Sequence, residues 1–128
     1  MDEKDIIEYW LNLSRQDFET AKILLRNKKY HHALFFCHLS VEKTLKAVIV
    51  KTTKTAPPLI HDLMRLAEKA KLSISQQHKN DLVELTTFNI EARYDDYKLS
   101  FYKKATKEFC TIYFKKTRRI LIWLKKFI

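Results

Sequence analysis

The stretch that decides the fold is residues 30–51, which read YHHALFFCHLSVEKTLKAVIVK. Apolar residues recur in it at short helical steps and would cover most of the circumference of a helix. Neither glycine nor proline interrupts it. A helix that is apolar on more than one side lies at the centre of a bundle, because every apolar face needs a neighbour to cover it. Residues 30–51 therefore predict one central helix.

The segment before this stretch predicts a second helix over residues 5–26. Its apolar residues recur at three- and four-residue steps from Ile7 to Leu25. Acidic residues lie near its start, and Asn27 with two lysines follows its end, as the helix dipole favours. Since only a few residues join the two helices, we expect them to be antiparallel neighbours.

The chain after residue 51 predicts three more helices, each bounded by residues that end or cap a helix. The expected order is a loop over 52–58 containing Pro57 and Pro58, a helix from about His61, a helix capped by Ser73 or Ser75 and ending near Ala92, a break over 94–100 (YDDYKLS), and a last helix from about Phe101. The expected buried side chains include Trp10, Phe18, Phe36, Val41, Leu45, Leu66, Phe109, Ile112, Trp123 and Phe127. The fold class is therefore all-α: a single domain over residues 1–128 that forms an antiparallel up-and-down bundle of about five helices.

Composition supports this fold and excludes several functions. The chain has no glycine, which disfavours tight β-hairpins and forbids a glycine-rich phosphate loop. Cys37 and Cys110 lie in apolar segments without metal-site spacing, which is typical of buried thiols in a reducing compartment. No signal peptide and no apolar run of about 18 residues is visible. We expect a cytoplasmic protein with no metal and no cofactor.

The net charge of +10 is unevenly distributed. Residues 101–128 carry nine Lys or Arg residues and one acidic residue, Glu108, for a net charge of +8. A basic last helix suits nucleic acid, an anionic ligand or an acidic partner. The alternative is a solvated face that only keeps the protein soluble.

Two polar groups interrupt the apolar pattern. His38, Glu42 and Lys46 are spaced four residues apart, so they form one line on the central helix. Because isolated buried charges are costly, this line would face a cleft, a partner charge or an interface. The alternative is an ordinary ion pair between Glu42 and Lys46. Residues 91–96, EARYDD, place Arg93 beside Tyr94 at a helix end, where a guanidinium could bind phosphate and a ring could stack on a base. The alternative is that Arg93 pairs with a carboxylate, that of Glu42, Glu91 or Asp96, and pins the loop.

These groups carry a resemblance to the prokaryotic HEPN family. The similar stretches are Trp10 with residues 21–25, Tyr30 with Ala33 and Phe36, VEKTLKA at 41–47, HDL at 61–63, and ARYDD at 92–96. The resemblance implies a bundle of about five helices, usually a homodimer, similar to the helical C-terminal domain of kanamycin nucleotidyltransferase. It also implies a minimal nucleotidyltransferase partner, in some members as a toxin–antitoxin pair.

The resemblance leaves two functions open. The first is a non-catalytic nucleotide- or RNA-binding protein, with phosphate bound by Lys43, Lys46, Arg93 and Tyr94, and a polar cleft formed by Glu42, His61, Asp95 and Asp96. The second is a metal-independent ribonuclease, which in this family carries an Arg-x4–6-His motif. No histidine follows Arg93 within reach. Arg26-x4-His31 fits that spacing but lies in a predicted turn. We therefore predict the binding function and no catalytic residue.

Overall fold

The computed structural model describes residues 2–128, and within that range Asp95 and Asp96 are described by their backbone alone. The described chain is all-α, as predicted, and contains six helices and no strand. They are α1 (Glu3–Arg26), α2 (Tyr30–Thr53), α3 (Leu63–Lys69), α4 (Gln76–Arg93), α5 (Asp95–Lys104) and α6 (Lys107–Lys125). The predicted number of about five is therefore close, but one helix too low.

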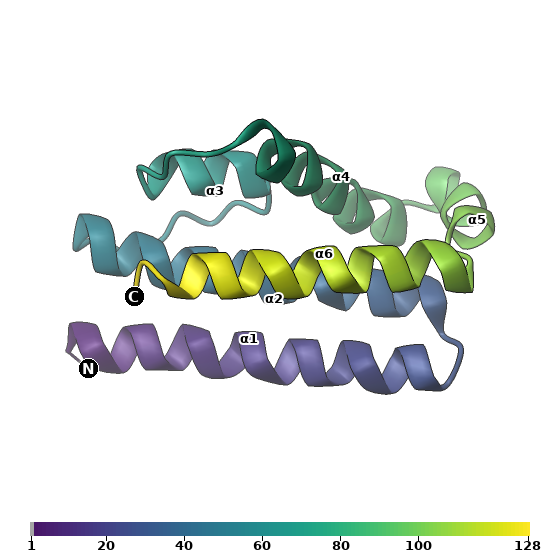
Figure 1. The fold of residues 1–128 in the computed structure, drawn as a ribbon, viewed down its shortest axis with the longest axis horizontal. Coiled ribbons are helices and arrows are strands. Elements are labelled where there is room, and N and C mark those ends of the chain that lie inside the picture. Colours follow the sequence, from purple (N-terminus) through teal and green to yellow (C-terminus); the bar gives the residue numbers. More distant parts are fainter. Residues whose placement is uncertain (1) are drawn as a thin grey trace.

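Figure 1 shows four long helices, α1, α2, α4 and α6, that run in alternating directions. The short α3 precedes α4, and the short α5 joins α4 to α6. Both termini lie at one end of the bundle (Figure 1). The other end holds the α1–α2 turn at residues 27–29, together with α5, and we call it the turn end. This is the up-and-down arrangement predicted from the sequence.

Helix α2 is the central helix, as its composition predicts. It packs against α1, α3, α4 and α6. From residue 44 to residue 50 every residue of α2 is buried. A single chain thus covers this part of α2, and no second subunit is needed to bury it. The homodimer remains an expectation from the family.

The core matches the expected one in part. Val41, Leu45 and Leu66 are fully buried, whereas Trp10, Phe18, Phe36, Phe109 and Trp123 are partly buried. The prediction that Ile112 and Phe127 face inward is wrong, because these residues are 52% and 38% exposed. Ile112 lies on the face of α6 opposite Cys110 and Phe114, and Phe127 follows the end of the helix.

The segment between α4 and α6 differs from the prediction. Residues 94–100 were expected to break the helical pattern, but α5 covers Asp95–Lys104. The last helix begins at Lys107 and not near Phe101, because Ala105 leaves helical geometry at ψ 68° and the Thr106 side chain accepts a hydrogen bond from the Phe109 N–H. Phe101 is fully buried and its ring stacks on Phe88 at 5.6 Å. One buried ring therefore holds α5 in place.

Candidate functional site

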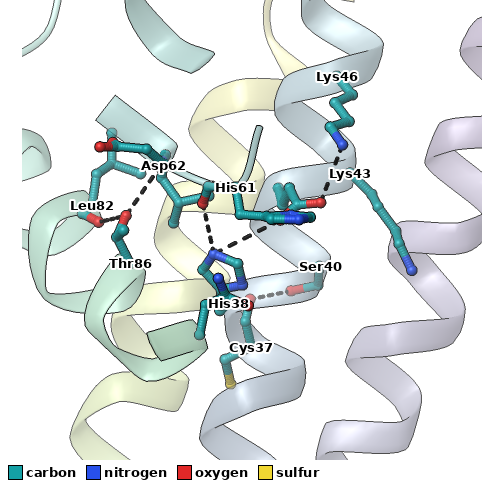
Figure 2. A network of polar contacts seen from close by, with 12 residues as sticks. Cys37, His38, Ser40, Lys43, Lys46, His61, Asp62, Leu82 and Thr86 are labelled. Atoms are coloured by element: carbon teal, nitrogen blue, oxygen red, sulfur yellow. Dashed lines mark hydrogen bonds and ion pairs between the residues drawn. The ribbon is translucent and has the colours of Figure 1, made fainter. Parts of the chain in front are cut away.

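Glu42, in the middle of α2, is the centre of a buried polar network. Its Oε1 accepts a hydrogen bond from His61 Nδ1 at 2.9 Å, and its Oε2 accepts one from Lys46 Nζ at 3.2 Å. Glu42 and Lys46 are only 4% and 5% exposed. His61 belongs to the segment between α2 and α3, so the network fastens that segment to α2 (Figure 2). Burial of a carboxylate is tolerated here because a cation and a hydrogen-bond donor compensate its charge.

His38, one turn before Glu42, joins the same network. Its Nε2 lies 3.0 Å from the His61 carbonyl oxygen, which can only accept, so Nε2 carries the proton (Figure 2). Burial lowers the pKa of His38, and the hydrogen bond to His61 and the nearby Glu42 oppose this only in part. Nδ1 is buried and has no hydrogen-bond partner in the described part of the chain. His38 is therefore a neutral, structural histidine.

Lys43 and Lys46 are both engaged with α1. Lys43 forms an ion pair with Asp17, and Lys46 Nζ lies 5.3 Å from the centre of the Trp10 ring. Beside them, Ser14 Oγ donates to the Ser40 carbonyl oxygen at 2.7 Å. These contacts favour a structural role for the two lysines at the α1–α2 interface, and phosphate binding by them stays a prediction.

Arg93 and Tyr94 lie at a second place, where α4 ends and α5 begins. The Arg93 Nε donates to Asn89 Oδ1 at 2.8 Å, and the guanidinium carbon lies 5.8 Å from the centre of the Phe35 ring. Arg93 is exposed, and Tyr94 is 59% exposed. Because the hydrogen bond to Asn89 uses only the Nε–H group, the other N–H groups of the guanidinium stay available for an anion.

The predicted site residues thus divide into separate groups. Glu42, Lys46 and His61 meet in the buried network, while Lys43 pairs across to α1. Among the described side chains, Arg93 contacts Asn89 and Phe35 and does not contact Glu42. The predicted roles of Asp95 and Asp96 fall on side chains outside the described part of the structure.

Comparison with known proteins shows the family of the chain. The model of the HEPN domain matches residues 7–127 of the chain. The chain belongs to the HEPN domain family. A comparison with curated proteins and one with solved structures give no match. Membership indicates a function related to nucleotides or RNA. The match spans nearly the whole of the described chain.

Sequence reasoning missed one feature of this HEPN domain, a basic cavity at the turn end. The α1–α2 turn and the α5–α6 junction together enclose about 370 Å³. The lining residues are Lys28, Lys29, Tyr30, His31, His32, Tyr102, Lys103, Ala105 and Thr106. Both contributing segments are visibly basic and aromatic in the sequence, but about 70 residues separate them, so only the fold reveals that they meet.

The described residues offer no metal centre, membrane span or activated thiol. Within residues 2–128 no group of three or more His, Cys, Asp or Glu side chains is placed to hold a metal ion. In the same range no helix is long and apolar enough to span a membrane. Burial raises the pKa of Cys37 above its ordinary value and that of Cys110 to about 12, so neither thiol is an activated nucleophile.

Proposed function

We propose that this HEPN domain is a non-catalytic, cytoplasmic protein that binds nucleotides or RNA, and that it acts with a minimal nucleotidyltransferase, as in toxin–antitoxin pairs of the family. Family membership supports a nucleotide-related role. The net charge of +10 supports an anionic ligand. The partner and the biological setting are proposed from the resemblance alone.

The observation that carries the proposal is the environment of Arg93. Its guanidinium lies over Phe35, is bonded on one side to Asn89, and is exposed on the surface. The neighbouring Tyr94 presents a ring that is 59% exposed. An arginine fork beside an exposed aromatic ring can bind a phosphate and stack on a base at the same time.

The same environment argues against cleavage of RNA at Arg93. Cleavage without a metal ion needs a general base and a general acid at the 2′-hydroxyl and the leaving oxygen. His38 is fully buried and its Nε2 is bonded to the His61 carbonyl oxygen, so it is not available as a general acid or base. The alternative function, a metal-independent ribonuclease, would use the Arg26-x4-His31 spacing, and His31 lines the cavity at the turn end.

Substitution of Arg93 tests the proposed function. We expect Arg93→Ala to weaken binding of a short single-stranded RNA with a 5′-hydroxyl end on the order of tenfold, because a charge-assisted contact to phosphate is lost. Arg93→Lys keeps the charge but not the fork and should give an intermediate loss. Loss of the Asn89 bond should cost only about 1 kcal/mol of folding free energy. Fluorescence anisotropy and thermal unfolding provide the two readouts.

The control is Arg65→Ala, which removes another exposed arginine, on α3. It should change neither RNA affinity nor stability. If Arg93→Ala lowers the unfolding temperature sharply while the folded protein binds RNA as well as the wild type does, Arg93 is structural and the proposed site is wrong.

We also propose a homodimer, as is usual in the family. Light scattering should then return about twice the chain mass of 15.4 kDa. The mass of a single chain at high micromolar concentration would contradict the dimer. The RNA-binding proposal would be unaffected, because the Arg93 variants test it separately.

A further inference from the structure

The cavity at the turn end concentrates positive charge. Three of its lining residues are lysines and two are histidines, and no acidic residue lines it. In the described part of the chain, Lys28, Lys29 and Lys103 take part in no hydrogen bond or ion pair through their side chains. Like charges held together without a counter-charge repel one another, and a bound anion would relieve that repulsion.

The neighbouring basic residues contrast with these three. Lys104, next to Lys103, lies 2.8 Å from Glu84 and 3.7 Å from Glu91. Lys116 of α6 lies 3.2 Å from Asp81. The acidic residues of α4 therefore neutralise lysines along the side of the bundle, while the lysines of the cavity remain without such partners. A second hollow, lined by Arg26, Lys28, Tyr30 and Lys107 among others, extends the basic surface from the cavity.

Aromatic rings form part of the same cavity. The His31 ring lies 4.0 Å from His32 and 5.4 Å from Tyr102, with centroid distances that indicate direct ring contact. Tyr102 is 65% exposed, so much of its ring is free to receive another flat group. Burial lowers the pKa of His31, and the nearby His32 and Lys29 lower it further, which reflects the positive potential of the cavity.

The size of the cavity limits the ligand. Its volume of about 370 Å³ is at the lower end of the range of small-molecule sites, about 300–1,000 Å³. A nucleic-acid duplex does not fit in such a space, but one nucleotide does. Lysines suit its phosphate as point charges, and the Tyr102 ring suits its base.

We propose that this cavity binds one 5′-phosphorylated nucleotide, with the phosphate between Lys29 and Lys103 and the base against Tyr102. The ligand is a free nucleoside monophosphate or the 5′-phosphorylated end of an RNA strand, which share this chemistry. The inference rests on the proposed nucleotide-related function and names a ligand class and a place for it, apart from Arg93.

Calorimetric titration with AMP tests the inference. Relative to wild type, Lys29→Gln/Lys103→Gln should weaken AMP binding on the order of a hundredfold, about tenfold for each lysine. The matched control, Lys69→Gln/Lys126→Gln, removes the same charge from exposed positions on α3 and after α6, and should bind AMP like the wild type. Tyr102→Ala should weaken AMP binding but leave binding of inorganic phosphate unchanged. Thermal unfolding verifies that every variant is folded.

Several results would overturn the inference. Equal weakening in the control pair would mean that net charge alone attracts AMP. Adenosine binding as tightly as AMP would remove the phosphate site, and inorganic phosphate binding as tightly as AMP would remove the base site. A comparison of 5′-phosphorylated with 5′-hydroxyl RNA identifies the source: a preference for the phosphorylated strand without AMP binding supports the strand end, and AMP binding supports the free nucleotide.

Failure of this inference is distinguishable from failure of the proposed function. Arg93→Ala should keep the AMP affinity of the wild type, because Arg93 does not line the cavity. If RNA binding is lost in Arg93→Ala while the cavity variants still bind AMP normally, the proposed function stands and the cavity site is wrong. If AMP binding is lost only in the cavity variants and Arg93→Ala still binds RNA normally, the cavity stands and the Arg93 site is wrong.

Discussion

At His38 the fold buries a titratable ring beside a buried carboxylate. Nε2 is committed to the His61 carbonyl oxygen, and Nδ1 is buried without a partner among the described residues. Protonation would place a second cation next to the one that Lys46 already supplies to Glu42. The folded protein therefore holds His38 neutral, whereas the unfolded chain does not.

This difference predicts how stability depends on pH. The pKa of His38 is lowered by burial in the folded state, and that of His31 is lowered in the same direction. The stability that these neutral rings contribute to the folded state is fully present above the unfolded pKa of about 6.5, and it is lost as the pH falls through the folded pKa. The free energy of unfolding should decline below pH 6.5 by up to about 1.4 kcal/mol per pH unit for the buried His38, while solvent screening makes the contribution of the more exposed His31 smaller. Urea unfolding at a series of pH values measures this slope.

Two variants distinguish the effect of His38 protonation on stability from the effect of lost packing in the core. His38→Gln should be less stable than wild type near neutral pH but show a shallower decline at lower pH. Thr117→Val changes another fully buried polar residue that does not titrate, and should keep the wild-type slope. A His38→Gln slope equal to that of the wild type would show that His38 does not resist protonation.

Residue spacing predicted some of these contacts and missed others. The Glu42–Lys46 pair follows from their separation of four residues on one helix, and it is present. His61 reaches Glu42 from a segment 19 residues away, a contact that no local period encodes. If Arg93 were structural, it was expected to pair with the carboxylate of Glu42, Glu91 or Asp96. Among the described side chains, the hydrogen-bond partner of Arg93 is Asn89, one helical turn earlier.

At the scale of elements, helix ends with strong local signals were predicted and weakly patterned elements were not. Asn27 ends α1 and Ser75 caps α4, as expected from residues that bond free backbone groups. Helix α5 has no apolar stripe: Tyr97, Leu99 and Tyr102 are exposed, and Phe101 alone supplies a fully buried ring. Periodicity cannot detect a helix held by one ring, because it needs several residues on one face.

The start of α6 is fixed by a side-chain cap. Because the Thr106 side chain accepts from the Phe109 N–H at 3.2 Å, Thr106→Ala should cost about 1 kcal/mol of folding free energy. Thr111→Ala is the matched control: it makes the same change one turn into α6, at an exposed position, and should stay within about 0.5 kcal/mol of wild type. Chemical denaturation compares the two. Equal losses would mean that the Thr106 cap does not define the break between α5 and α6.

At the scale of the whole molecule, the fold redistributes the charge that the sequence shows as one basic block. Within residues 101–128, Lys104 and Lys116 are paired with acidic residues of α4. Lys103 instead joins Lys28 and Lys29 around the turn-end cavity. The prediction of a basic last helix was therefore correct in sign, but the concentration of charge at the turn end arises from segments distant in sequence, and only the folded chain brings them together.

Because of this charge distribution we propose anion binding at the turn end, where α4 ends with Arg93 and Tyr94 (Figure 1). The buried Glu42 network lies away from that surface, within α2 and its neighbours, and acts on stability. We therefore propose two separate roles for the polar residues of the HEPN domain, one in folding and one in binding. In the binding role, the protein is proposed to bind RNA without cutting it.

The most direct test incubates the purified protein with a structured RNA in a buffer that contains a metal chelator, and analyses the RNA on native and denaturing gels. We expect a retarded complex on the native gel and intact strands on the denaturing gel, for the wild type and for His31→Ala alike, with a weaker complex for Arg93→Ala. Cleavage by the wild type that disappears in Arg93→Ala would contradict binding without cleavage at the proposed site. Cleavage that disappears only in His31→Ala would contradict it as well, and would place a ribonuclease centre in the turn-end cavity.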